Sequence, residues 1–285
     1  MTKNNFKTLF FASLFLVLVA PGVASAHQPR IVESVQTFVS DPEISKAYYG
    51  KLTGEPDVYT IASPVPFNLY VGVLVPDIRN QKKDVSAVVL KDGVQVVVLE
   101  GSMFPWTKFF EKFGHDTYWQ GPEYKAHVDA GNYEIRVWSS NNDSKYSLAI
   151  GGQEKFNFEE SLNALTLIPE IKKNFFEKSP MDFIFSPLGW GFIIGMYVLA
   201  FLVGFMYRQI LRKVSIKPLG EVRKNIGKID RSARFAIGLG LLLWAVTTTW
   251  SPILIFFSGF AFFEALAGWC ILYAALGRNT CPTNS

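Results

Sequence analysis

Two thiols are the first residues that could do chemistry, because Cys270 and Cys281 are the only cysteines among 285 residues. They lie in 268-GWCILYAALGRNTCP-282, at the end of an apolar run. Ten intervening residues and no nearby histidine do not fit a zinc site. The topology predicted below puts both on the cytoplasmic side, where thiols are normally kept reduced. We therefore expect free thiols with a packing role, and a transient redox or persulfide role stays open.

Three histidines are the next candidates: His27, His115 and His127. His27 becomes the N-terminal residue if a signal peptide is removed after Ala26, and its amine and imidazole can then bind copper. His115 and His127 are available as further ligands, although no spacing places them near His27. Surface or turn roles are the alternative for both. Copper at His27 is thus the one cofactor that these residues suggest, and we otherwise expect none.

Aromatic residues are concentrated in 103-MFPWTKFFEKFGHDTYWQGPEY-124. Trp106, Tyr118 and Trp119 could form a flat platform for a sugar ring or a partner surface. The alternative, which we favour, is a short amphipathic helix that closes one end of the domain. Its signal is the i, i+3, i+4, i+7 spacing of Trp106, Phe109, Phe110 and Phe113.

Motifs of serine hydrolases, P-loop proteins, dinucleotide-binding proteins and zinc proteases are absent from the sequence. We identify no catalytic residue and expect a protein that is not an enzyme.

The N-terminus has the pattern of a secretory signal peptide over residues 1–26. Lys3 and Lys7 precede an apolar core too short to span a bilayer, and the small residues Ala24 to Ala26 form a cleavage site.

Two later segments are long and apolar enough for membrane spans. Residues 187–207 contain no charged side chain, whereas 233–277 are too long for a single helix. Pro252 divides the second segment after Trp250, because proline disrupts a continuing helix. We predict three transmembrane helices, one span followed by a helical hairpin.

The charge distribution predicts the orientation of these spans. Residues 208–234 carry nine Lys and Arg against two acidic residues, whereas 27–187 carry 16 basic and 21 acidic residues. A short basic loop stays in the cytoplasm. We therefore expect a multi-pass protein of the plasma (inner) membrane, with an extracytoplasmic N-terminal domain, a basic cytoplasmic linker (208–232) and a cytoplasmic tail (278–285). The lipid bilayer accounts for the basic residues, and no nucleic acid partner is expected.

Short strands separated by turns fill the N-terminal region. We predict strands at 57–62, 67–76, 85–101, 132–140 and 145–152, with a hairpin turn at Asp92-Gly93. This pattern indicates an extracytoplasmic antiparallel β-sandwich within residues 27–160. The segment before Tyr133 resembles a tyrosine corner, with Ile135 where immunoglobulin domains have a cysteine. Residues 161–186 are expected to be a partly helical juxtamembrane connector, whose apolar side chains can touch the bilayer.

Two polar patterns frame the hairpin, N-x-G-x-x-D-R-x-x-R and C-x-x-Y-x-x-x-G-x-x-T-C. Their residues are Asn225, Gly227, Asp230, Arg231, Arg234, Cys270, Tyr273, Gly277, Thr280 and Cys281. With this hairpin, the segment 225–281 resembles the transmembrane domain of the YgaP-like inner membrane family, although Ile271 stands where that family commonly has proline. The resemblance implies a two-helix membrane hairpin that can dimerise. The family's name-giving member also has a rhodanese domain, which no part of this chain can supply, so sulfurtransferase activity is not carried over.

Most of these motif residues suit structural roles. We expect Asp230 as a helix N-cap and Gly277 as a left-handed C-cap. Arg231 and Arg234 are expected to extend toward lipid phosphates. A face of small residues, Ser258, Ala261, Ala265 and Gly268, predicts close helix packing within the hairpin or across a dimer.

Glu264 interrupts the apolar sequence 260-FAFFEALAG-268, near the middle of its predicted span. An unpartnered carboxylate there costs about 2.5–3.5 kcal/mol. One reading is proton or cation handling, or a polar contact with another protein. The other is a protonated acid bonded to a facing group, for which Glu264→Gln would leave assembly unchanged.

Together these features predict a non-enzymatic, membrane-anchored protein whose β domain binds a ligand or partner. Its hairpin would assemble into a homodimer or with another membrane protein. One alternative is a redox, sulfur- or metal-handling protein that uses Cys270 and Cys281 or copper at His27. Another is a carbohydrate-binding accessory module.

Overall fold

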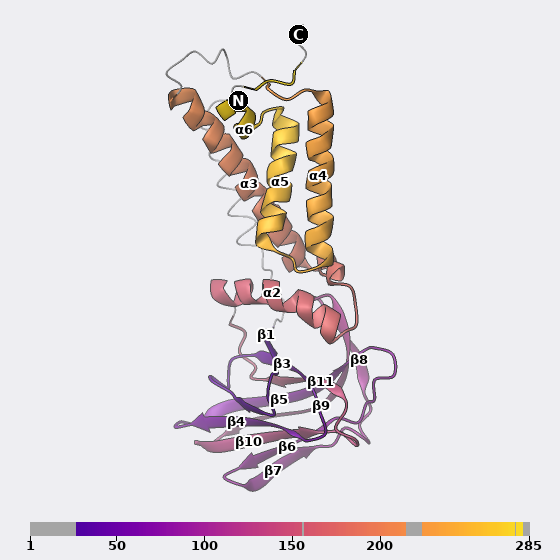
Figure 1. Cartoon of the computed structure of the whole chain (residues 1–285). Helices are drawn as coiled ribbons and strands as arrows, with labels where there is room; N and C mark the ends of the chain where they lie inside the picture. The colour runs from indigo at the N-terminus through magenta and orange to yellow at the C-terminus, as the bar shows by residue number, and fades with distance from the viewer. Residues whose placement is uncertain (1–26, 156, 215–223, 277, 282–285) are drawn as a thin grey trace. The chain divides into compact units, whose positions relative to one another are not determined.

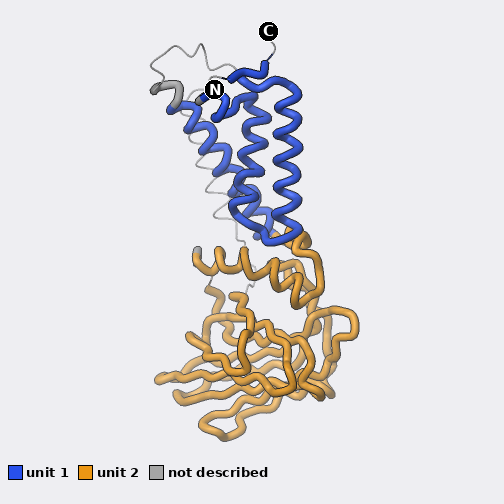
Figure 2. Tube along the Cα trace, viewed as in Figure 1, with its two compact units in different colours: residues 1–22, 187–285 blue, residues 23–186 orange. Residues whose placement is uncertain are grey.

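The structure is a computed structural model, and it describes residues 27–155, 157–214, 224–276 and 278–281. The predicted signal peptide and Gly277 lie outside the described residues. The described chain forms two compact units, a β-rich unit that ends at Ser186 and a helical unit that begins at Pro187 (Figure 2).

The β-rich unit is built from two sheets. The six-stranded sheet has the order β1-β3-β11-β5-β9-β8, and the five-stranded sheet has the order β2-β4-β10-β6-β7 (Figure 1). The strands are β1 (Gln28–Ile31), β2 (Gln36–Phe38), β3 (Lys46–Lys51), β4 (Asp57–Ser63), β5 (Phe67–Pro76), β6 (Ser86–Lys91), β7 (Val94–Leu99), β8 (Thr107–Glu111), β9 (Asp116–Val128), β10 (Gly131–Trp138) and β11 (Lys145–Ile150). Each predicted strand segment is confirmed.

The sandwich was predicted to be antiparallel throughout, but two of its strand pairs are parallel. β1 pairs with β3 in parallel, and β2 pairs with β4 in parallel. Both parallel strands come from residues 28–38, where the sequence shows no clear alternation of apolar and polar residues, and both join a sheet at its edge.

Alternate side chains of the two sheets meet in one apolar core. A buried polar contact crosses this core, because the hydroxyls of Tyr59 in β4 and Tyr146 in β11 lie 2.7 Å apart. Tyr146 also donates to Asp57 at 2.5 Å. The contact satisfies hydroxyl groups that would otherwise be costly to bury.

Two predicted turns are confirmed in detail. Asp92 and Gly93 both have positive φ angles, 47° and 81°, as the two-residue turn between β6 and β7 requires. The Tyr133 hydroxyl donates to the Asp129 carbonyl at 2.8 Å, which forms the tyrosine corner. Ile135 is fully buried in the core.

The amphipathic helix predicted around Trp106 to Phe113 is wrong. Trp106 directly precedes β8, Phe109 and Phe110 lie in β8, and Phe113 lies in the turn to β9; β8 pairs with β9 in antiparallel register. β8 is the last strand of its sheet. Successive aromatics, Phe109 and Phe110, therefore occupy both of its faces and mimic a helical spacing.

One helix covers the outer face of the six-stranded sheet. It is α2 (Phe158–Asn174), followed by the short 3₁₀-helix η1 (Pro180–Phe185) (Figure 1). The predicted connector is thus partly helical. Its apolar side chains Ile171, Phe175 and Phe176 are buried against Tyr118 of the sheet, not left for the bilayer.

The helical unit contains α3 (Pro187–Val214), α4 (Lys228–Thr247), α5 (Pro252–Ala267) and α6 (Ile271–Leu276). Among the described residues, one helical stretch, Pro187–Ile210, is long and apolar enough to cross a membrane, and α5 is a shorter apolar helix. The predicted break is confirmed, since Trp250 has a φ of 54° and Pro252 begins α5.

The ends of the hairpin helices differ from the prediction. α4 is capped by Gly227, so Asp230 lies in the first turn and is not the N-cap. α5 ends at Ala267 because Gly268 adopts the left-handed conformation, with a φ of 64°, and donates its N–H to the Glu264 carbonyl at 3.0 Å. Gly268 is thus the left-handed C-cap of α5, and the C-cap role predicted for Gly277 is not tested, because that residue lies outside the described residues.

The small-residue face packs within this chain. Ser258 donates to the Gly238 carbonyl of α4 at 2.8 Å. On the other side, a Cβ atom at Gly259 would lie only 2.9 Å from the Tyr197 ring of α3. Small residues thus allow α5 to approach both neighbouring helices closely.

Candidate functional site

A cleft lies between α2 and the outer face of the six-stranded sheet, with a volume of about 50 Å³. All six strands contribute lining residues, from Pro29 of β1 to Phe109 of β8. The lining residues are spread across the sheet, but α2 contributes only Ile168 and Ile171, near its C-terminal end. A volume of about 50 Å³ is room for a few water molecules, so the site is a small gap beneath α2.

Small side chains on the floor create this space. Ala47 of β3 and Ser147 and Ala149 of β11 point toward α2, and their neighbours Tyr48 and Leu148 point into the core between the sheets. The apolar roof is formed by Ile168, Ile171 and Phe176. A helix on a floor of larger residues would leave no gap.

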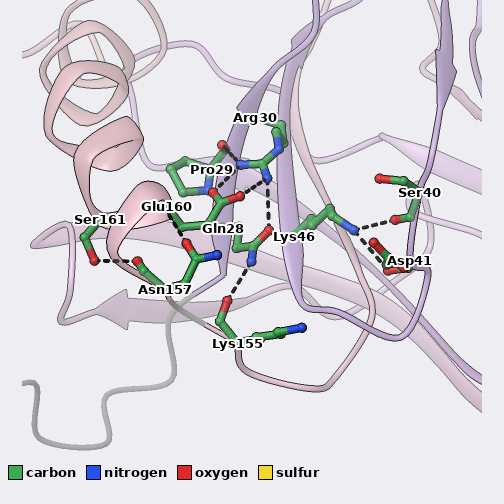
Figure 3. A network of polar contacts seen from close by, with 10 residues as sticks. All are labelled: Gln28, Pro29, Arg30, Ser40, Asp41, Lys46, Lys155, Asn157, Glu160 and Ser161. Atoms are coloured by element: carbon green, nitrogen blue, oxygen red, sulfur yellow. Dashed lines mark hydrogen bonds and ion pairs between the residues drawn. The ribbon is translucent and has the colours of Figure 1, made fainter.

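The N-terminal end of α2 is fastened to β1 by a charged network (Figure 3). Arg30 donates to both carboxylate oxygens of Glu160, at 2.9 and 2.7 Å, and to Gln28 at 2.9 Å. Asn157 caps the helix by accepting the Glu160 N–H at 2.8 Å. A bidentate Arg–carboxylate pair is among the stronger polar contacts and fixes the position of this end.

The other end of α2 is fastened by a buried ion pair. Lys172 is fully buried and donates to Asp116 at 2.8 Å and to the Gly114 carbonyl at 2.6 Å. Lys178 donates to the second oxygen of Asp116 at 2.9 Å. Burial lowers the pKa of Lys172, and the nearby Asp116 opposes this shift. Ion pairs thus hold both ends of α2 against the sheet.

A few polar groups line the otherwise apolar cleft. The hydroxyls of Tyr49 and Tyr118 lie 2.8 Å apart. Glu111 accepts the N–H groups of Phe113 and Gly114 at 2.5 and 2.6 Å, while burial raises the pKa of its carboxyl group. Such a lining is typical of small-molecule sites, whose volume is commonly about 300–1,000 Å³, several times that of this gap.

His27 also lines the cleft, and its Nδ1 contacts the Ser45 hydroxyl. Burial lowers the pKa of its imidazole, and Glu154 opposes the shift. The described residues contain no group of three or more His, Cys, Asp and Glu that could hold a metal ion. Copper at His27 therefore stays a prediction.

The other two histidines have local contacts. His115 lies in the β8–β9 turn with a φ of 61°, and its ring centroid is 5.0 Å from that of Phe110. His127 Nδ1 lies 3.2 Å from the side-chain oxygen of Asn68.

The predicted aromatic platform is not formed as one surface. Trp106 donates to the Gly101 carbonyl at 2.8 Å and packs against the core. Tyr118 and Trp119 are successive residues of β9 and so point to opposite faces of the sheet. Tyr118 is buried in the cleft, whereas Trp119 donates to Asp77 at 3.0 Å and lies beneath the Lys83 ammonium group.

A second polar cluster holds the end of the helical hairpin. The Asn225 side chain donates to the Cys270 carbonyl at 2.9 Å and accepts the Cys270 N–H at 2.7 Å. The backbone N–H of Asn225 donates to the Gly268 carbonyl at 3.0 Å, and the Asn225 carbonyl accepts the Thr280 N–H at 3.1 Å. Asn225 thereby joins the two patterns seen in the sequence.

Gly227 and Asp230 complete this junction. The Gly227 N–H donates to the Thr280 hydroxyl at 3.0 Å, which in turn donates to Asp230 at 3.2 Å. A Cβ atom at Gly227 would lie 2.3 Å from the Thr280 carbonyl oxygen, so only glycine fits there.

Arg231 and Arg234 were predicted to extend toward lipid phosphates, but both are held by contacts within the hairpin. Arg231 donates to the Ala265 carbonyl at 2.6 Å, at the C-terminal end of α5. Arg234 forms an ion pair with Glu264 and lies 5.2 Å from the ring centroid of Tyr273. Both side chains bind the neighbouring helix of the hairpin.

Glu264 is a paired acid in the last turn of α5, not a lone acid at mid-span. It is buried, contacts Arg234 and accepts the Ile271 N–H at 3.2 Å. The reading of a neutral, protonated acid is therefore replaced by an ion pair.

Both cysteines are free, as predicted. Cys270 is buried beside Asn225, and Cys281 Sγ lies 3.3 Å from the Lys224 carbonyl oxygen. A redox role for them stays untested.

We expect Asn225→Ala to lower the free energy of unfolding of the helical unit by about 1–3 kcal/mol. The Cys270 N–H would lose its buried acceptor, which is the costly change. The Cys270 carbonyl keeps a second donor, the Ala274 N–H. Thermal unfolding of the full-length protein in nanodiscs measures the effect. Asn225→Asp keeps an acceptor for the Cys270 N–H but sets its second oxygen against the Cys270 carbonyl, so it should recover only part of the loss. Equal stability of all three proteins would contradict the assignment.

Comparisons with known proteins agree with the C-terminal resemblance. Residues 222–284 match the family described as "Inner membrane protein YgaP-like, transmembrane domain". Together with the apolar helix Pro187–Ile210, this match identifies the C-terminal helices as a membrane domain. No curated protein matches the chain.

Two solved structures resemble part of the chain distantly. One is the pre-peptidase C-terminal domain of a collagenase from Bacillus anthracis, at 13% identity and a TM-score of 0.25, over 44% of this chain and 96% of that domain. Another is a β-glucosidase from Paenibacillus barengoltzii, at 11% identity and a TM-score of 0.21, over 46% of this chain and 14% of the β-glucosidase chain. Neither likeness supports an assignment of function.

Proposed function

We propose that this is a multi-pass protein of the plasma (inner) membrane that binds a ligand through its extracytoplasmic β-rich unit. The observation that carries the proposal is the cleft beneath α2, whose floor of Ala47, Ser147 and Ala149 leaves space across the sheet. A closely packed helix–sheet contact would need no such gap.

The lining of the cleft favours a mainly apolar ligand. Because its volume is only about 50 Å³, a small molecule would enter only if α2 moves away from the sheet, and a folded partner is excluded. Tyr49, Tyr118 and Glu111 supply the few polar groups that would orient it.

A binding role accounts for the polar groups better than a catalytic one. The Tyr49 and Tyr118 hydroxyls contact each other, Glu111 accepts two backbone N–H groups, and His27 contacts Ser45. Groups held by such contacts can orient a bound ligand. His27 and Ser45 do place a base beside a hydroxyl, but Ser45 is buried and does not line the cleft, so its hydroxyl is not presented to a substrate there.

The membrane domain is proposed to cross the bilayer three times, through α3 and the α4–α5 hairpin. The basic segment 208–234 favours the cytoplasmic side for the loop between α3 and α4. Exposed apolar side chains on α4, among them Phe235, Ile237 and Trp244, suit contact with lipid, a second copy or another membrane protein.

Filling the cleft tests the binding role. We expect Ala149→Leu to abolish retention of a small-molecule adduct that the wild-type protein carries when released from its own membrane. The larger side chain would occupy the floor of the cleft. Native mass spectrometry of the full-length protein measures the adduct.

Ala62→Leu is the matched control, because Ala62 is an exposed residue of β4 in the other sheet. This variant should keep the adduct. Spectra without an adduct in the wild-type protein, or with the same adduct in all three proteins, would refute the proposed site.

A further inference from the structure

An exposed apolar patch lies on the β-rich unit next to the point where the chain enters the helical unit. It consists of Phe110 of β8 and of Met181 and Phe185 of η1, which are 47, 39 and 63% exposed. Exposed side chains of this size, gathered in one place, commonly mark an interaction surface.

Ring contacts join the two parts of this patch. The centroid of the His115 ring lies 5.0 Å from that of Phe110 and 5.8 Å from that of Phe185. His115 therefore links the β8–β9 turn to the end of η1. The turn between β8 and β9 thus lies close to Phe185.

The covalent chain limits how far Phe185 can be from the bilayer. The apolar helical stretch begins at Pro187, and two residues of chain reach at most about 7 Å. The headgroup layer of a bilayer extends about 5–8 Å beyond each side of the hydrocarbon core. Phe185 thus lies within reach of this layer wherever the rest of the unit points.

We infer that the patch of Phe110, Met181 and Phe185 is a membrane-contact surface that lies in the lipid headgroup layer. Aromatic side chains are favoured at this depth, and Lys112 in the same turn is exposed and suited to lipid phosphates. The surface would hold the β8–β9 hairpin, and with it Glu111 at one end of the cleft, against the membrane. The inference rests on the proposal that α3 crosses the bilayer.

Photo-crosslinking to lipid tests the inference in the full-length protein. The aromatic photo-crosslinker p-benzoylphenylalanine is introduced separately in place of Phe110, Phe185, Trp190 and Phe38, and each variant is placed in phosphatidylcholine nanodiscs. Phe38 is 65% exposed on β2 of the other sheet and is the matched control. We expect lipid adducts at Phe110 and Phe185, a strong adduct at Trp190 within α3, and none at Phe38.

The positions separate the possible failures. Adducts at Trp190 and Phe185 without one at Phe110 would overturn the membrane-contact surface and leave the proposed span intact. Loss of the adduct at Trp190 as well would overturn the span and this inference together. Equal adducts at Phe38 and Phe110, or crosslinks of Phe110 to a second protein chain, would also overturn it.

Discussion

Asp116→Ala is expected to lower the free energy of opening of α2 by about 3–5 kcal/mol, because it leaves a charged lysine buried without its carboxylate. Lys172 is fully buried and would keep only the Gly114 carbonyl as an acceptor. Lys172→Met should cost less, since Asp116 keeps Lys178 and the methionine side chain suits the apolar surroundings. The order of the two effects is the specific prediction.

Amide hydrogen exchange of the full-length protein in nanodiscs measures this opening residue by residue. Protection should fall in α2 and persist in β10, which belongs to the other sheet. The exposed pair Lys82–Asp143 provides the control, because Asp143→Asn should change stability by less than about 1 kcal/mol. Equal effects of Asp116→Ala and Asp143→Asn would show that the buried pair does not hold α2 down.

The same result bears on the cleft. α2 forms its roof and is held by Arg30–Glu160 at one end and by Lys172–Asp116 at the other. If the Lys172 end opens, the roof residues Ile171 and Phe176 leave the sheet, and the space beneath them becomes open surface. The loss of α2 protection should therefore accompany loss of the small-molecule adduct.

Local patterns in the sequence predicted much of the β-rich unit. The Asp92-Gly93 turn and the contact of Tyr133 with Asp129 depend on neighbouring residues, so short-range reasoning was sufficient. The helix predicted around Phe109 failed because an edge strand with aromatics on both faces can imitate a period of 3.6.

The cleft could not be predicted, because it depends on where α2 lies. Small residues alternating with large apolar ones, as in Ser147-Leu148-Ala149, were the available signal. That pattern is equally common on a strand covered by a closely packed helix. Only the position of α2 across β3 and β11 turns these residues into the floor of a cavity.

The hairpin motifs were recognised, yet their contacts were misjudged. Asn225 and Cys270 lie 45 positions apart, and their pairing requires the chain to return to the same end of the hairpin. Glu264 was placed at mid-span because the apolar sequence continues past Gly268. The positive φ angle of Gly268 ends the helix there, which brings Glu264 to its last turn and next to Arg234.

The pairing of Glu264 with Arg234 leads to the last prediction, which contrasts two single substitutions. Arg234→Gln should lower the free energy of unfolding of the helical unit by about 3–5 kcal/mol, because Glu264 would stay buried without its positively charged partner. Glu264→Gln should cost about 1.5–3 kcal/mol, the range for a lost hydrogen bond to a charged group. Its smaller cost reflects the partners that Arg234 keeps, Asp230 at 3.3 Å and the Tyr273 ring.

The double variant Arg234→Gln with Glu264→Gln completes the cycle and should cost clearly less than the two single losses combined, because each single change already breaks the same pair. Thermal unfolding of the full-length protein in nanodiscs provides the four values, and the exposed Arg278→Gln is the control for loss of a positive charge. Additive losses would mean that the two side chains act independently. If Glu264→Gln is as stable as the wild-type protein, Glu264 is a protonated acid, which is the alternative that the sequence alone left open.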